Sequence, residues 1–225
     1  MPLASSTVEN YLKAIYQAQA ALDVDARLVS MGHLANALGV VPGTATTMVK
    51  ALAESGLVDY EPYAGVRLTS AGEKLAALVL RRHRLMELFL VKVLDMSWAE
   101  VHDEAERLEH AASDKLIDHI DTMLGRPSTD PHGDPIPNSN GSIVTNEYQT
   151  LLTCPLHVPV VVTRVIDQDS EFLRFLENNN LKPGQTIRVE ARDASADQVI
   201  FRGKNEREIT IGTLAAAKLQ VRPGC

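Results

Sequence analysis

The sequence predicts a mainly α-helical protein that ends in a small β domain. Three observations support this fold class. Apolar residues recur at helical spacing through most of the first 124 residues. Two short alternating runs, at 57–63 and 65–70, interrupt the helices as a β-hairpin would. From residue 155 onward, short β-like runs alternate with turn residues, a pattern typical of a small β-barrel.

The N-terminal elements follow one another in a recognisable order. We expect helices over 6–22, 29–39 and 43–55, with a turn at 40–43 before the third helix. The hairpin follows and turns at Ala64-Gly65. Helix, turn, helix and hairpin in this order are the layout of a winged helix-turn-helix, whose second motif helix enters the major groove of DNA.

A run of helices comes next. Ser70 is expected to cap a long helix over 71–94, a further helix begins at Ser97, and another covers 114–124. Residues 126–141 hold four prolines and form a linker or an ordered loop. In the β-rich remainder, a single short helix is expected at 170–179.

These elements suggest a division of the chain into parts. The expected parts are a winged helix-turn-helix domain at 1–72, a helical domain at 73–140, a linker at 141–154 and a small β-barrel domain at 155–225.

Composition narrows the class of protein. With 45% hydrophobic and 23% charged residues, the chain is an ordinary globular protein. It has no apolar run long enough to span a bilayer and no secretory signal pattern, so we expect a cytoplasmic protein without a membrane partner. Cys154 and Cys225 are expected to be reduced thiols rather than a disulfide or a zinc site.

The charge balance bears on DNA binding. The net charge is −7, and residues 1–75 contain five Lys/Arg against seven Asp/Glu, a net of −2. A constitutive DNA-binding domain usually carries a basic surface. The sequence therefore favours DNA binding that is switched on by added positive charge.

The third helix has an unusually small and hydroxylic first turn. Such residues let a helix approach the duplex and can contact phosphates or base edges. The candidate DNA-binding residues are Gly43, Thr44, Thr46, Thr47 and Lys50 on this helix and Arg67 on the hairpin. The alternative is that the threonines only fill a helix terminus within a structural three-helix core.

The strongest chemical pattern lies in residues 83–110. His83 and Glu87 are spaced i, i+4 on the long helix and share one face. A second stripe on the next helix contains His102, Glu106, Glu109 and His110. Carboxylates gathered by two antiparallel helices would repel one another, and a divalent ion would relieve that repulsion. The alternative is a solvated charged face.

The donor set indicates the kind of ion. The six positions could hold two ions, and they offer oxygen and imidazole donors without a thiolate, which suits Mn²⁺ or Fe²⁺. The isolated histidines are expected to be ordinary surface or core residues; these are His33, His119, His132 and His157.

Several segments together resemble the diphtheria-toxin-repressor family of iron- and manganese-dependent repressors, and its manganese branch in particular. The segments that carry the resemblance are ENYLKAIY (9–16), VPGTATTMVKAL (41–52), YEPYAGVRLTSAG (60–72), RRHRLMELFL (81–90), VHDEAERLEHAASD (101–114) and GDPIP (133–137). The resemblance implies a winged helix, a helical dimerisation domain and a Src-homology-3-like barrel. It also implies a homodimer on a palindromic operator, with Mn²⁺ or alternatively Fe²⁺ as corepressor.

The resemblance also assigns ligands. His83, Glu87 and His102 match an ancillary site, and Gln168 and Glu171 align loosely with the pair that completes it. The site that triggers DNA binding matches Glu106, Glu109 and His110. Iron-responsive members have Cys at the position of Glu106, and the harder oxygen favours manganese.

The first helix departs from the family pattern. Asn10 stands at the family's ligand position, and Lys13 stands where the manganese branch can have a second carboxylate. Asn10 could ligate through its amide oxygen, or Glu9 could take its place.

Two other classes of function compete with a metal-dependent repressor. The first is a dinuclear metalloenzyme, but the Glu-x-x-His signature of helical di-iron enzymes is missing, as are nucleophile motifs and a phosphate-binding loop. The second is a metal-independent DNA-binding or scaffold protein. We therefore expect a regulator rather than an enzyme, with the ion acting as a switch.

Overall fold

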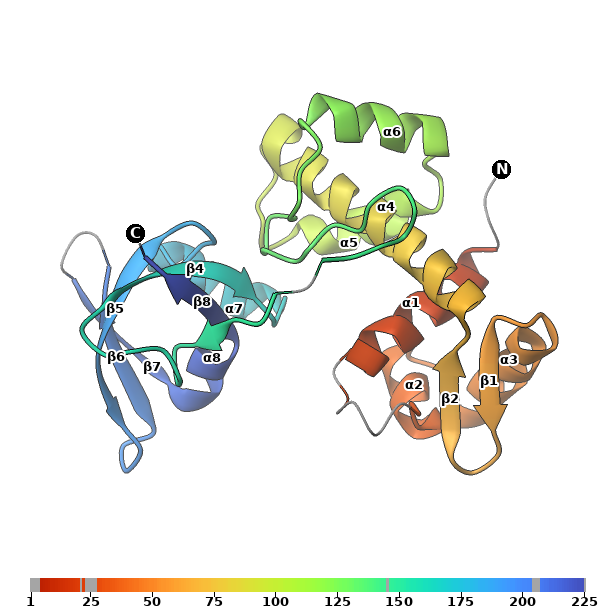
Figure 1. Cartoon of the computed structure of the whole chain (residues 1–225), viewed down its shortest axis with the longest axis horizontal. Helices are drawn as coiled ribbons and strands as arrows, with labels where there is room; N and C mark the ends of the chain where they lie inside the picture. Colours follow the sequence, from red (N-terminus) through yellow and green to blue (C-terminus); the bar gives the residue numbers. More distant parts are fainter. Residues whose placement is uncertain (1–4, 21, 23–27, 145, 204–206, 225) are drawn as a thin grey trace.

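The computed structural model describes residues 5–20, 22, 28–144, 146–203 and 207–224. Within them the chain forms three parts in sequence order, each with its own apolar core. Figure 1 shows them as an N-terminal part in red and orange, a helical part in yellow and green, and a β-rich part in teal to dark blue. Cys225, one of the two thiols considered above, lies outside the described residues.

The N-terminal part has the predicted order of elements. They are α1 (Ser6–Ala20), α2 (Met31–Ala37), α3 (Pro42–Glu54), β1 (Val58–Glu61) and β2 (Gly65–Leu68), with the two strands antiparallel. Leu12, Ile15, Leu34 and Val49 are fully buried at its centre. The structure corrects the expected turn at 40–43, because Pro42 and Gly43 already belong to α3. Proline is favourable at the first position of a helix, since the backbone N–H that it lacks would have no partner inside the helix there.

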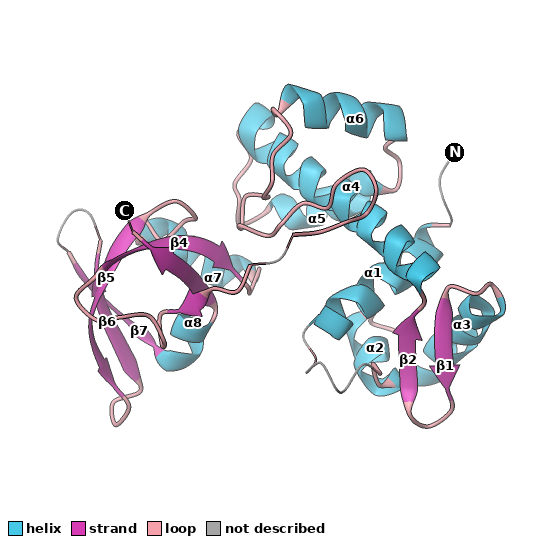
Figure 2. Ribbon diagram, in the orientation of Figure 1, coloured by secondary structure: helices cyan, strands magenta, loops and turns pink. Residues whose placement is uncertain are grey.

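The helical part consists of α4 (Ser70–Leu94), α5 (Val101–Glu109) and α6 (Asp114–Met123). Figure 2 shows α4 as the long helix that connects the N-terminal part to this bundle. The N-cap of α4 is Thr69 and not Ser70, because the Thr69 hydroxyl accepts the backbone N–H of Gly72 at 3.2 Å.

The next helix begins later than predicted. Residues 98–100 form a turn, so α5 starts at Val101 rather than at Ser97. Tertiary packing explains the delay, since Trp98 and Ala99 are buried in the core of the β-rich part instead of on a helix face. Trp98 thereby fastens the helical part to the β-rich part.

The β-rich part is an antiparallel sheet with strand order β3-β8-β4-β5-β6-β7. The strands are β3 (Gln149–Thr150), β4 (Pro159–Val165), β5 (Thr186–Asp193), β6 (Gln198–Arg202), β7 (Glu208–Gly212) and β8 (Leu219–Pro223), accompanied by α7 (Ser170–Asn178) and α8 (Thr213–Ala217). Within the described residues no pairing joins β3 to β7, so the sheet is shown but the closed barrel predicted from the sequence is not.

Two elements of the β-rich part were not anticipated. They are the two-residue β3 and the five-residue α8, both too short for a periodic pattern. β3 pairs with β8, and Leu151 and Cys154 are buried in the same core. Residues 149–154, expected to be linker, thus contribute to this sheet and core.

Among the described residues, no helix combines the length and the apolar character needed to cross a membrane.

Candidate metal centre and DNA-binding surface

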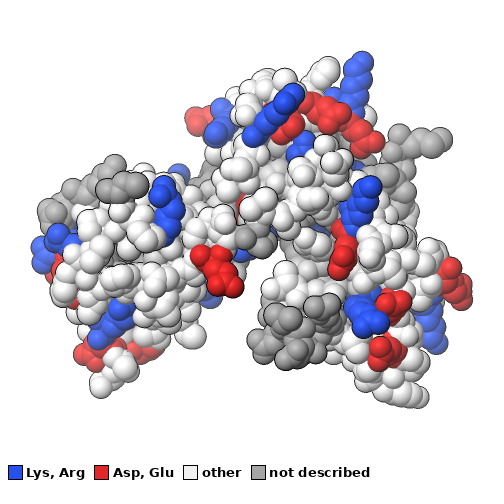
Figure 3. Space-filling view, viewed as in Figure 1, with Lys and Arg blue, Asp and Glu red and all other residues white. Residues whose placement is uncertain are grey.

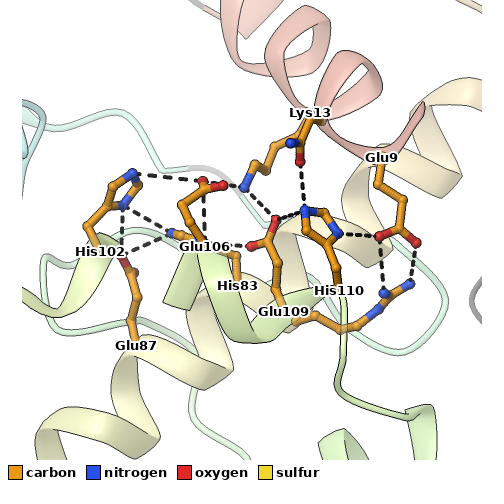
Figure 4. A network of polar contacts seen from close by, with 10 residues as sticks. Glu9, Lys13, His83, Glu87, His102, Glu106, Glu109 and His110 are labelled. Atoms are coloured by element: carbon orange, nitrogen blue, oxygen red, sulfur yellow. Dashed lines mark hydrogen bonds and ion pairs between the residues drawn. The ribbon is translucent and has the colours of Figure 1, made fainter. Parts of the chain in front are cut away.

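Two helices carry most of the candidate ligands (Figure 4). On α4, His83 and Glu87 lie one turn apart and are buried. On α5 and at its C-terminal end lie His102, Glu106, Glu109 and His110. Because α4 and α5 pack together, the two stripes meet. We call His83, Glu87 and His102 the α4 cluster, and Glu106, Glu109 and His110 the α5 cluster.

The α4 cluster is held by short polar contacts. His83 Nε2 lies 3.0 Å from Glu87 Oε1 and 3.2 Å from His102 Nδ1, and His102 Nδ1 lies 3.1 Å from the same Glu87 oxygen. Donor atoms of His83, His102 and Glu106 lie within 4.8 Å of one another. Three donors at this spacing can share one ion.

The α5 cluster is joined to α1 by a lysine. Donor atoms of Glu106, Glu109 and His110 lie within 4.8 Å of one another. The Lys13 ammonium bonds to Glu106 Oε1 at 2.5 Å and to Glu109 Oε1 at 2.7 Å, and this lysine is only 5% exposed. The sequence predicted unrelieved repulsion among these carboxylates, but Lys13 supplies a positive charge between two of them.

A second set of contacts also connects α1 to the α5 cluster. His110 Nδ1 lies 2.7 Å from Glu9 Oε2, and His110 Nε2 lies 2.7 Å from Asn10 Oδ1. Glu9 is fully buried and pairs with Arg82 at 3.2 Å. Asn10 is therefore beside the α5 cluster, as its family position implies. Sequence reasoning considered Glu9 only as a substitute ligand and missed Arg82, because a buried arginine gives no periodic signal.

The surroundings shift the pKa values of the buried cluster residues. Burial disfavours the charged form of His83, but its hydrogen bonds to Glu109 and Glu87 outweigh burial and raise its pKa to about 9. Burial likewise opposes ionisation of Glu87, yet the neighbouring imidazoles of His102, His132 and His83 hold its pKa well below the usual range. Both carboxylates that contact His83 are thus ionised at neutral pH and available to a cation.

The two candidate ligands from the β-rich part lie differently. Gln168 Nε2 donates to Asp134 Oδ2 at 3.0 Å. Glu171 is exposed in the first turn of α7, and its backbone N–H bonds to Asp169. Among the described residues, the structure shows no contact between either side chain and the α4 cluster. These two assignments depend on the family resemblance.

The donor set of both clusters fits a divalent ion. It consists of carboxylate oxygens and imidazole nitrogens, and Glu87 Oε2 is a buried oxygen without a hydrogen-bond partner among the described residues. Cys154 is buried in the core of the β-rich part, so the described thiol is separate from both clusters. Oxygen and imidazole donors suit Mn²⁺ and Fe²⁺.

The candidate DNA-binding residues lie on the N-terminal part. On α3, Gly43, Thr44, Thr47 and Lys50 are exposed, and Thr46 is half-buried. The hydroxyls of Thr46 and Thr47 donate to backbone carbonyls four residues earlier, at 2.9 and 3.0 Å. These bonds use the hydroxyl hydrogens of Thr46 and Thr47, so the two hydroxyl oxygens can accept further hydrogen bonds but cannot donate to a phosphate.

The hairpin contributes less free positive charge than the sequence suggested. Arg67 forms an exposed ion pair with Asp59, its cross-strand neighbour, at 3.1 Å. Figure 3 shows acidic and basic side chains interspersed over the visible described surface rather than gathered in one basic face. The hairpin therefore attracts DNA only weakly unless Arg67 leaves Asp59 and pairs with a phosphate.

Three family models match consecutive parts of the chain. Residues 4–66 match the iron-dependent repressor N-terminal DNA-binding domain, and residues 69–138 match the iron-dependent repressor metal-binding and dimerisation domain. Residues 149–223 match the FeoA domain. The first two matches together contain α1 through α6, and the third contains the whole antiparallel sheet.

Whole-chain relatives agree with these matches. The iron-dependent repressor IdeR of Mycobacterium leprae is 28% identical over 209 residues, covering 88% of this chain and 89% of the relative. A solved manganese-dependent transcriptional repressor in complex with manganese has a TM-score of 0.88 at 38% identity, covering 96% of this chain and all of that one. ScaR with bound Zn²⁺ has a TM-score of 0.76 at 30% identity, covering 96% and 99%. The chain belongs to the diphtheria-toxin-repressor family of metal-dependent transcriptional repressors.

Proposed function

We propose that this protein is a Mn²⁺-dependent repressor that binds a palindromic operator as a homodimer. One observation carries the proposal: the α5 cluster is contacted directly by α1, a helix of the DNA-binding part. Glu9, Asn10 and Lys13 of α1 all reach Glu106, Glu109 or His110. A change at the cluster is therefore transmitted to the domain that carries α3.

The residues divide into two proposed ion sites. Glu106, Glu109 and His110 would hold the triggering ion together with Asn10, whose Oδ1 lies beside His110. His83, Glu87 and His102 would hold the ancillary ion, with Gln168 and Glu171 completing it. When bound, an ion supplies positive charge that neutralises carboxylates near the DNA-binding part. The chain's own residues then determine how α1 is held against α5.

Manganese is proposed over iron on the chemistry of Glu106. A carboxylate is a harder ligand than a thiolate, and none of the residues proposed for the two sites is a cysteine. The manganese-bound neighbour with 38% identity supports this choice. Iron as the cellular corepressor is the alternative, and the iron-dependent relatives support that possibility.

The proposed dimer uses the helical part. Leu85 and Leu88 of α4 are buried in the subunit's own core. Large apolar side chains are exposed on α4, α5 and α6, and these are Val93, Leu94, Leu108, Leu116 and Met123. Apolar side chains exposed on one domain favour a self-complementary interface, and a two-fold dimer would present two α3 helices to two half-sites.

The proposal also includes the domain boundaries and the shape of the C-terminal sheet. We propose the domain division 1–72, 73–140 and a C-terminal domain, which by its β3 pairing begins near residue 149 rather than 155. We also propose that this C-terminal sheet curls into a Src-homology-3-like barrel.

A DNA-binding titration tests the function. Duplexes are first selected from a random pool with Mn²⁺-loaded protein, and one selected duplex is then titrated with chelator-treated protein and with Mn²⁺, Fe²⁺ or Zn²⁺ added. We expect tight binding with Mn²⁺ and at least tenfold weaker binding with chelator. Equal binding in chelator would contradict the switch, and a preference for Fe²⁺ would assign the protein to the iron-responsive branch.

A further inference from the structure

The loop between α6 and β3 carries polar side chains that are buried. Asp130, His132 and Asp134 are 5%, 0% and 5% exposed. Asp130 Oδ1 accepts the backbone N–H groups of His132 and Asp134, at 2.8 and 2.9 Å, and thereby fixes a tight turn. Gly133 follows with φ of +87°, and a Cβ there would overlap the Thr163 carbonyl of β4. The turn is thus tightly packed between the helical part and the β-rich part.

The hydrogen bonds of His132 determine which ring nitrogen is free. Nε2 lies 2.8 Å from the backbone carbonyl oxygen of Trp98, and since a carbonyl only accepts, Nε2 carries the hydrogen. In the neutral ring Nδ1 is then a bare lone pair. It has no hydrogen-bond partner among the described residues and lies 3.7 Å from Glu87 Oε2.

Two carboxylate oxygens beside this nitrogen also have no hydrogen-bond partner in the described part of the chain. They are Glu87 Oε2 and Asp130 Oδ2, each on a side chain that is fully buried. A buried polar atom without a partner is unfavourable, because it has lost its hydrogen bonds to water and gained none from the protein. One donor atom from each of Glu87, Asp130 and His132 lies within 4.8 Å of the other two. A single positive species among them would satisfy all three.

The spacing favours a metal ion over a proton. A hydrogen bond from Nδ1 to Oε2 would need about 2.7–3.2 Å, and the observed separation is 3.7 Å. Two ligands that are each about 2.0–2.2 Å from one ion are separated by roughly 3–4 Å, which agrees with this distance. We propose that Glu87, Asp130 and His132 form a further binding site for a divalent cation, buried beneath the 126–141 loop.

The charged side chains around this site are compatible with a bound cation. Arg84 is the nearest guanidinium, but its Nε is 3.6 Å from Asp130 Oδ2, and its Nη1 donates to the Pro135 carbonyl. The same guanidinium also faces Asp134, whose Oδ1 lies 3.7 Å from its Nη2. Burial and the neighbouring carboxylates of Asp134 and Glu87 raise the pKa of Asp130 to about 8, so a cation bound there would replace the proton of Asp130. Two carboxylates and one imidazole suit Mn²⁺, Fe²⁺ or Zn²⁺.

Glu87 would serve two sites at once. Its Oε1 contacts His83 and His102 in the α4 cluster, and its Oε2 faces His132. The site also connects to the β-rich part, because the His132 carbonyl accepts the backbone N–H of Val165 on β4 at 2.8 Å. An ion here would hold the loop on α4 and so strengthen the docking of the C-terminal sheet.

Counting bound Mn²⁺ in the full-length protein tests the proposal. Chelator-treated protein is equilibrated with Mn²⁺ by dialysis, and the bound metal is measured by atomic absorption. The variants are His132→Gln and Asp130→Asn. Asn at 130 keeps the oxygen that accepts the two backbone N–H groups, so this variant preserves the turn. His157→Gln is the matched control, because the His157 side chain is 67% exposed.

We expect both site variants to bind one ion fewer per subunit than the parent and the control. Crystals of the unmodified protein soaked in Mn²⁺ should give an anomalous peak between Glu87, Asp130 and His132. The crystal measurement decides the matter if His132→Gln does not fold. An unchanged ion count in Asp130→Asn, or the absence of that peak, would overturn the proposal and leave His132 as a positioning residue for Glu87. DNA binding is not a readout here, so the result is independent of the proposed function.

Discussion

Replacing Lys13 with methionine is the most informative perturbation of this structure. The lysine ammonium lies between Glu106 and Glu109, the two carboxylates proposed to hold the triggering ion. Methionine retains most of the apolar stem and removes the charge. The substitution therefore separates the role of Lys13 as a tethered cation from its role in packing α1 against α5.

The burial of the two carboxylates determines how much folding stability the Lys13→Met protein loses in chelator. Glu109 is fully buried and would keep the protonated His83 as an ion-pair partner, so the cost lies near the lower end of the about 3–5 kcal/mol typical of breaking a buried ion pair. The Glu106 side chain is 34% exposed, and that pair adds about 1 kcal/mol or less. Taking roughly 3 kcal/mol in total, the melting temperature in chelator should fall by about 6–12 °C for a chain of this size.

The same substitution should strengthen Mn²⁺ binding. An ion bound by both carboxylates must displace the ammonium, so the wild-type protein loses these ion pairs when it binds metal. Without Lys13 that cost disappears, and up to about 3 kcal/mol corresponds to roughly a hundredfold gain in affinity. We expect at least a tenfold gain.

The assay is a thermal melt in chelator and in Mn²⁺, together with a calorimetric Mn²⁺ titration. Lys74→Met, at an exposed lysine on α4, is the matched control and should change neither quantity. A Lys13→Met protein that is as stable as the parent in chelator and binds Mn²⁺ no more tightly would refute the reasoning.

Four further expectations concern the surfaces and ligands described above. Thr46→Glu with Thr47→Glu should abolish binding to the selected duplex and leave Mn²⁺ binding intact in calorimetry, because carboxylates at the start of α3 repel phosphate; normal DNA binding would move the recognition surface elsewhere. His110→Ala should weaken Mn²⁺-dependent DNA binding tenfold or more, about 1.4 kcal/mol, measured by fluorescence anisotropy in buffered metal. Glu106→Cys should shift the response toward softer ions, which parallel titrations with Mn²⁺ and Zn²⁺ would reveal. Because the pKa of His83 is raised to about 9, this residue is protonated at pH 7 and must lose that proton to ligate an ion. Mn²⁺ affinity should therefore rise between pH 7 and 9, and calorimetry in buffers of different ionisation enthalpy should detect proton release; a flat profile would argue against His83 as a ligand.

The sequence by itself determined the order of elements and the two stripes of His and Glu residues on α4 and α5. Apolar periodicity placed α1 through α6 to within a few residues, because each helix must bury one face and that face repeats every 3.6 residues. His83 and Glu87 were paired for the same reason, since residues four apart on a helix are neighbours. The Pro-rich 126–141 segment was correctly separated from regular structure.

Only the tertiary structure determined which residues lie opposite the His and Glu residues of these two stripes. Three such contacts are Lys13 between Glu106 and Glu109, Glu9 beside His110, and His132 facing Glu87. They join residues that are 45 to 101 positions apart in the sequence. No local period encodes such contacts, because they depend on how separate elements pack. The late start of α5 has the same origin, since burial of Trp98 in the neighbouring core outweighs its local helical pattern.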